Sequence, residues 1–110
     1  MLIRYAYFEG RIKLGFEEAF TSFVHQRLVP LWIKFPGAEL VRVMRPRQSD
    51  TAEPHYEMVL AFHYKSFEAI DMTLKSDVRI ESRAETVELM KMFEGRIFHT
   101  VFQIDEFETA

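Results

Sequence analysis

The chain has 110 residues, 48% of them hydrophobic, and carries a formal net charge of -3 from 14 basic and 17 acidic residues. This length fits a single domain over residues 1–110, and the absence of a basic cluster argues against a nucleic-acid partner. The chain has no cysteine, which excludes a disulfide scaffold, a cysteine nucleophile and a thiolate metal site.

The first part of the chain predicts a strand followed by a long helix. Leu2–Phe8 is apolar on both of its faces, as expected for a central strand covered on two sides. Phe16–Phe35 shows the three-and-four spacing of an amphipathic helix. Pro30 falls inside this helix, so we expect a break near Leu28–Val29, and Pro36-Gly37 should end the element.

The middle of the chain predicts two paired strands. Glu39–Arg45 and Tyr56–Tyr64 both alternate in the two-residue period of a strand. The polar segment Arg45–His55 joins them, and it is long for a hairpin connection.

The last part predicts more helix and a final strand. Ser66 and Ser76 are expected N-caps within the helical segment Phe67–Phe93. We expect Gly95 to close this helix as its C′ residue. Phe98–Ile104 then alternates as the fourth strand.

The order of these elements, βαββαβ, is that of the ferredoxin-like motif. We therefore predict an α+β fold with a four-stranded antiparallel sheet. Helices on one face leave the other face of the sheet uncovered, which favours a homodimer, and a chain this short has limited capacity to bury its own apolar surface.

Two strand histidines are candidates for acid/base chemistry. His63 and His99 share one sheet face with Glu57 if the strand parities hold, and a carboxylate beside a histidine supports a general base. The alternative is that both are edge or interface groups satisfied by hydrogen bonds. The four histidines have no metal-ligand spacing, so we expect no metal site.

A third candidate base lies in the first helix. His25 comes just before the turn that Pro30 should loosen, so it could face a pocket under the helix, where burial would lower its pKa. The alternative is an exposed helix residue. Tyr5, Tyr7 and Trp32 could line an apolar pocket with polar groups, or belong to an ordinary core.

The N-terminus lacks a signal-peptide pattern, and no apolar stretch reaches membrane-spanning length. Together with the absence of cysteine, this predicts a cytoplasmic protein without a membrane partner.

The chain resembles the dimeric α/β-barrel superfamily, closest to its EthD-like branch. The resemblance rests on the first strand and on four further segments: Phe16-Glu17-Glu18-Ala19-Phe20 leading to His25, Pro36-Gly37-Ala38, the turn at Ser76-Asp77, and Gly95–Val101. The family places a histidine late in the first helix before a Pro-Gly, where this chain has His25, with Leu28 at the usual spacing. The stretch from His25 to Trp32 is also similar to the sugar mutarotase branch, in which a helix histidine is the acid/base.

This resemblance implies a homodimer whose sheets pack face to face, with a pocket between each sheet and its own helices and no cofactor. Related proteins run proton-transfer chemistry such as isomerisation, cyclisation or cofactor-free oxygenation.

Two functional hypotheses follow from this resemblance and from the residues above. The first is a small cofactor-independent enzyme that acts on a small, largely apolar carbonyl or aromatic metabolite, with His25 as base, assisted by His63 or His99, and Tyr5, Tyr7, Trp32 and Glu57 binding the substrate. The alternative is a non-catalytic accessory or ligand-binding protein. Haem binding, which needs an axial histidine facing a wide cavity, is a less favoured third reading.

Overall fold

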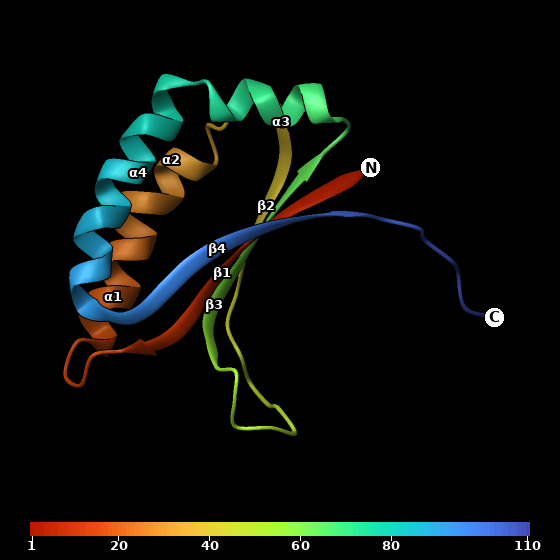
Figure 1. Ribbon diagram of the computed structural model, residues 1–110. Helices are drawn as coiled ribbons and strands as arrows, with labels where there is room; N and C mark the ends of the chain where they lie inside the picture. The colour runs from red at the N-terminus through yellow and green to blue at the C-terminus, as the bar shows by residue number, and fades with distance from the viewer.

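The computed structural model describes all residues 1–110, which form one sheet with a layer of helices (Figure 1). The strands are β1 (Leu2–Ile12), β2 (Ala38–Met44), β3 (Tyr56–Tyr64) and β4 (Phe93–Gln103). The helical elements are α1 (Glu17–Phe23), the π-helical turn η1 (Val24–Leu28), α2 (Val29–Trp32), α3 (Phe67–Leu74), α4 (Asp77–Leu89) and the 3-10 turn η2 (Met90–Met92).

The four strands form an antiparallel sheet in the order β2-β3-β1-β4. The helices α1, α2 and α4 lie together on one side of this sheet, and α3 crosses one end (Figure 1). This arrangement confirms the predicted ferredoxin-like α+β fold. The structure contains no helix with the length and hydrophobicity of a membrane-spanning segment.

Strands β1 and β4 are longer than predicted, because both continue through a glycine. Gly10 of β1 pairs with Gly95 of β4, and both have positive φ angles, 137° and 151°. A Cβ atom at Gly10 would collide with the carbonyl oxygen of Glu94, and one at Gly95 with that of Glu9. The prediction that Gly95 closes a helix is wrong, since the helical segment already ends at Met92.

The first helix contains a widened turn where a break was expected. The backbone N–H of Val29 donates to the carbonyl of Val24, five residues back, instead of four. This π-turn lies directly before Pro30, which has no N–H to donate and whose ring would clash with a regular helical carbonyl. Val24 and Leu28 are both fully buried, so the widened turn keeps this side of the helix on the core.

Helices α3 and α4 begin at the two serine caps expected from the sequence. Ser66 Oγ accepts from the N–H of Ala69, and Ser76 Oγ accepts from the N–H of Arg79. A buried hydrogen-bond chain ties α3 to the sheet: Tyr64 donates to Thr73 Oγ1 at 3.0 Å, and Thr73 donates to the carbonyl of Pro36 at 2.6 Å.

The two faces of the sheet differ in cover. Side chains on the helix side of β1 and β3 are buried in the core, among them Ala6, Phe8, Met58, Leu60 and Phe62. The other face has no helix over it and carries a ladder of aromatic rings with centroids 4.9 to 6.4 Å apart, formed by Tyr5, Tyr7, Tyr56, Phe98 and Phe102. We call this aromatic ladder the open face.

Candidate functional site

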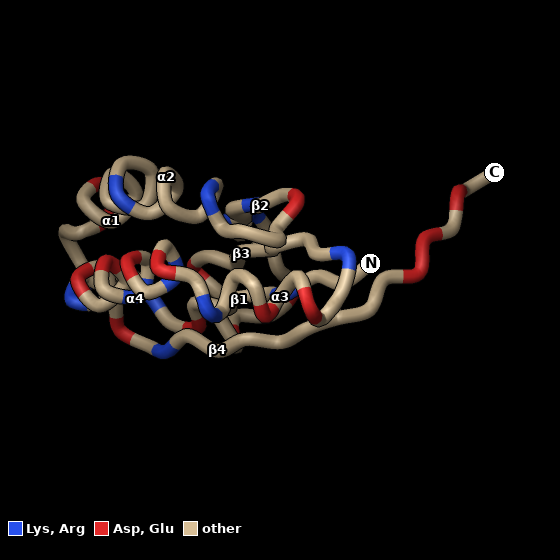
Figure 2. The backbone as a smooth tube through the Cα atoms, turned by 90° about the horizontal axis from the view of Figure 1, so that it is seen from above, with Lys and Arg blue, Asp and Glu red and all other residues tan.

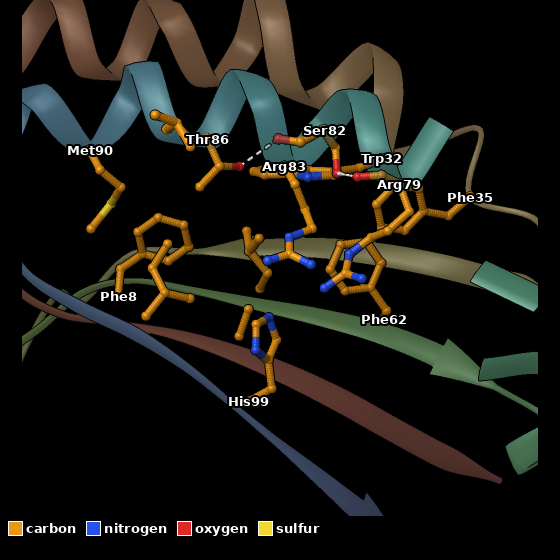
Figure 3. Close-up of a pocket in the computed structure, with 14 residues that line it drawn as sticks. Phe8, Trp32, Phe35, Phe62, Arg79, Ser82, Arg83, Thr86, Met90 and His99 are labelled. Carbon is orange, nitrogen blue, oxygen red and sulfur yellow. Dashed lines mark hydrogen bonds between the residues drawn. The ribbon is translucent and has the colours of Figure 1, made fainter. Parts of the chain in front are cut away.

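A cavity of about 440 Å³ lies between the sheet and helix α4 (Figure 3). Strands β1, β3 and β4 form its floor, α4 and η2 its roof, and the end of the first helical segment one wall. The lining residues are Ala6, Phe8, Trp32, Phe35, Leu60, Phe62, Arg79, Ser82, Arg83, Thr86, Val87, Met90, Ile97 and His99.

Aromatic rings define the apolar part of the cavity. Trp32 meets Phe62 edge-on with centroids 6.3 Å apart, and Phe35 stacks on Phe62 at 5.2 Å. Trp32 is the last residue of α2, is 4% exposed and contacts the sheet through Phe62. Such a wall suits a flat apolar ligand, since aromatic pairs favour stacked and edge-on contacts.

His99 is the titratable base at this cavity. It pairs across β1 with Ala6, so its side chain points to the helix side, and Figure 3 shows it directed at α4. Its pKa is lowered to about 4, first because burial disfavours the charged imidazolium and then because Arg4, Arg79 and Arg83 repel it. His99 keeps exposed surface at the cavity mouth, where water screens part of this repulsion, and the ring is neutral at pH 7.

Arginines surround this histidine without acidic partners. Arg79 and Arg83 lie one turn apart on α4, and Figure 3 shows both side chains directed down into the cavity toward His99. Arg4 approaches from β1, and neither it nor the two helix arginines forms an ion pair. Burial lowers the pKa of Arg79, and the charges of Arg4 and Arg83 lower it further.

His25 does not reach this cavity. It is exposed on the outer side of η1, one residue after the fully buried Val24. Consecutive helical residues point about 100° apart, so burial of Val24 and Leu28 turns His25 to solvent. The expectation that His25 faces a pocket under the helix is therefore wrong. Leu28, at the spacing usual for the resembled family, is the residue that faces inward.

The strand residues expected to share one face are separated. His63 pairs with Ile3, whereas His99 pairs with Ala6, and these two β1 positions point to opposite faces. The prediction that His63, His99 and Glu57 meet is therefore wrong. His63 lies on the open face, where its Nε2 is buried without a hydrogen-bond partner. Glu57 is instead paired with His55, with 2.6 Å between Nε2 and Oε2.

The predicted ligand-binding aromatics divide in the same way. Trp32 lines the cavity, as expected. Tyr5 and Tyr7 stack on each other on the open face, 5.7 Å between centroids, and do not contribute to the helix-side cavity.

Sequence reasoning missed the arginines. A signal was present in the helix pattern: neither Arg79 nor Arg83 has an acidic residue three or four positions away, where a solvated helix face would place one. Arg4, in a strand otherwise apolar on both faces, was a second signal. The structure holds no group of three or more histidine or acidic side chains able to bind a metal ion.

No family model matches the chain, and no curated protein does. Solved structures, however, match over almost its whole length. An EthD family protein from Bacillus halodurans is 20% identical with a TM-score of 0.73, covering 96% of this chain and 99% of that chain. SnoaB, a cofactor-independent oxygenase from Streptomyces nogalater, is 15% identical with a TM-score of 0.66, covering 96% and 94%.

A third neighbour is a dimeric protein of unknown function with a ferredoxin-like fold from Bacteroides fragilis. It is 8% identical with a TM-score of 0.67, and 94% of this chain and 95% of that chain are covered. At these identities the likeness concerns the fold. The chain has the ferredoxin-like fold of these proteins, an EthD family member among them, and the resemblance predicted from the sequence is confirmed at that level.

Proposed function

We propose that this protein is a small cofactor-independent enzyme that acts by acid/base chemistry on a small, largely apolar carbonyl or aromatic metabolite. The observation that carries the proposal is the neutral imidazole of His99 at the mouth of an aromatic cavity. SnoaB, with the same fold, is described as a cofactor-independent oxygenase, which supports chemistry of this class.

The reaction that fits the cavity is proton abstraction next to a carbonyl. The C–H bond breaks, its electron pair forms an enolate, and the proton moves to His99; return of the proton to another carbon completes an isomerisation. The arginines around His99 make the cavity electropositive, which stabilises the negative charge that develops in the transition state. The negative enolate also offsets the repulsion of these arginines on the imidazolium, so His99 becomes a stronger base as charge develops.

We also propose that the working form is a homodimer in which the open faces of two copies pack together. An uncovered aromatic ladder is unfavourable in water, and Phe102 and Met44 on this face are 47% and 37% exposed. The Bacteroides fragilis neighbour is described as dimeric, which supports the proposal. The helix-side cavity would stay free in such a dimer, because it opens on the other side of the sheet.

The test is a screen for carbon-acid exchange. Small aromatic ketones and unsaturated lactones are incubated with the protein in D₂O, and deuterium uptake at carbon is followed by NMR. We expect H99Q to slow exchange of a responsive compound by about 10²–10⁴-fold, the usual contribution of a general base. The matched control H25Q changes an exposed histidine and should exchange like the wild type. Equal rates for H99Q and wild type would overturn the role of His99.

A non-catalytic binding protein is the second candidate, and one observation favours it. His99 makes no hydrogen bond to a side chain, so nothing in the protein fixes its tautomer as a carboxylate partner does in many general bases. A compound that binds in the cavity but shows no exchange, with wild type and H99Q alike, supports this second candidate.

A further inference from the structure

The positive charge at the cavity has no counter-charge in the protein. Arg79 and Arg83 project from α4, Arg4 approaches from β1, and no acidic residue lines the cavity. On α4, Glu85 is paired with Arg27 of η1, with 2.7 Å between Nη2 and Oε1.

This clustering opposes the charge of the whole molecule, which is -3. Burial and mutual repulsion both act against the charged form of Arg79. Like charges one helical turn apart destabilise a helix, and a partly buried group feels such repulsion more than an exposed one. An arrangement of this kind is relieved when an anion lies between the guanidinium groups.

We propose that the cavity binds a carboxylate-bearing ligand, with its carboxylate between Arg79 and Arg83 and its apolar body against Trp32 and Phe62. Arginine pairs bind planar carboxylates through parallel, charge-assisted hydrogen bonds. That such a ligand is the substrate rests on the proposed function. That it binds rests only on the arginines and the aromatic wall.

The remaining polar groups favour a carboxylate over a phosphate. Ser82 donates its O–H to the carbonyl of Arg79 at 3.0 Å, and Thr86 donates to the carbonyl of Ser82 at 2.7 Å. Both hydroxyl protons are therefore in use, which leaves few donors for the oxygens of a strongly hydrated phosphate. Most of the lining is hydrophobic, which suits an anion with a large apolar body.

Binding of such an anion has a consequence for His99. The carboxylate reduces the repulsion from Arg4, Arg79 and Arg83, the charged groups that face this ring from β1 and α4. The pKa of His99 therefore rises on binding, and the ligand binds more tightly as the pH falls into the range where the ring takes up its proton.

The experiment compares two probes of the same shape, hydrocinnamate and the uncharged hydrocinnamyl alcohol, by isothermal titration calorimetry at pH 7 and low salt. We expect the carboxylate to bind and the alcohol to bind at least tenfold more weakly. R79Q and R83Q should each weaken hydrocinnamate about tenfold or more, the usual effect of losing a charged hydrogen bond, and leave the alcohol unchanged. R47Q, which removes the same charge from an exposed loop residue, is the matched control and should bind like the wild type.

The anion site would be overturned if the two probes bound equally or if neither bound. It would also be overturned if R47Q and R79Q lost the same affinity for hydrocinnamate. NMR of the His99 ring adds a second readout, since hydrocinnamate should raise the pKa of His99 and the alcohol should not. H99Q separates this proposal from the proposed function: it should slow carbon-acid exchange about 10²–10⁴-fold yet still bind hydrocinnamate at pH 7, where the ring is neutral.

Discussion

The imidazole of His99 owes its behaviour to residues far away in the chain. Burial lowers the pKa of the ring most, and the charges of Arg4 from the first strand and of Arg79 and Arg83 from the last long helix lower it further, to about 4. A neutral histidine at pH 7 can accept a proton, and its basicity depends on whether an anion lies beside the arginines. In the proposed mechanism, this side chain would couple the charge of the ligand to the proton transfer.

The lowered pKa of His99 predicts that the stability of the protein depends on pH. In the unfolded chain His99 takes up its proton near its ordinary pKa of 6.5, whereas in the native protein it does so near 4. Between these values the unfolded state binds more protons, so the free energy of unfolding falls as the pH drops from about 6.5 to about 4. We expect H99Q to flatten this fall, measured by urea denaturation across the interval.

His63, whose pKa is also lowered by burial and by Arg42, accounts for a separate part of the slope. H63Q is therefore the comparison variant, and it should remove its own share while leaving that of His99. A profile of H99Q parallel to that of the wild type across the whole interval would contradict the assignment.

Alternation of polar and apolar residues within one strand shows which side chains share a face of that strand, but not how the faces of two strands match. The two faces of each strand could be assigned, but the face that His63 and His99 occupy relative to each other depends on the register across β1, which pairs them with Ile3 and Ala6. Trp32 was assigned either to a pocket wall or to an ordinary core, and it belongs to both, since it lines the cavity and is 4% exposed. The arginines were missed because Arg4 and Arg79 are joined only by the fold.

At the level of elements, the pairing of two glycines lets β1 and β4, the longest strands, continue to the core residue Phe93. Gly10 and Gly95 lie opposite each other with positive φ, and their backbones approach too closely for a side chain. The continuation of β1 and β4 pairs Ile12 with Phe93. Phe93 directly follows η2, which forms part of the cavity roof.

The close pairing of Gly10 with Gly95 predicts that replacing Gly10 by alanine lowers the stability of the protein. G10A should destabilise the protein by about 2 kcal/mol or more, because alanine resists a positive φ and its Cβ would displace the backbone of Glu94. G15A is the matched control: Gly15 also has a positive φ, 89°, but nothing lies near its missing Cβ, so only the conformational cost of about 1 kcal/mol applies. Chemical denaturation measures both, and equal losses would refute the close approach.

The elements themselves could be predicted well in order and less well at their ends. The serine caps Ser66 and Ser76 and the strand Tyr56–Tyr64 were found because local chemistry determines them. The end of β1 was placed too early and the start of β4 too late, since a glycine was taken as a stop where cross-strand pairing overrides its low strand propensity. A break at Pro30 was expected, but whether it becomes a kink or a π-turn depends on the packing of Val24 and Leu28.

The whole molecule is asymmetric: helices cover one face of the sheet and no helix covers the other (Figure 1). The C-terminal tail, with its acidic residues, extends away from the body in both views (Figures 1 and 2), and Phe107 in it is 87% exposed. The fold and its uncovered face followed from the order of elements in the sequence. The helix-side cavity followed only from the resemblance, since it depends on how α4 packs over β4 and not on any one pattern.

The open face leads us to predict the oligomeric state of the protein in solution. The wild type should sediment as a dimer of this chain, and F102K should shift it to the monomer, because a lysine would be buried against the aromatic ladder without a partner. F67K is the matched control, since Phe67 is 63% exposed on α3 and away from this face. A monomeric wild type, or equal effects of the two variants, would count against the dimer.

Trp32 is the single tryptophan of the chain, 4% exposed, with Phe62 edge-on against it. Its emission therefore originates at one known position, on the wall of the cavity and on the helix side of the sheet. Occupancy of the cavity should alter the intensity and wavelength of that light, whereas association through the open face should leave it unchanged. The protein thus contains its own optical probe, which can follow ligand binding separately from assembly without any added label.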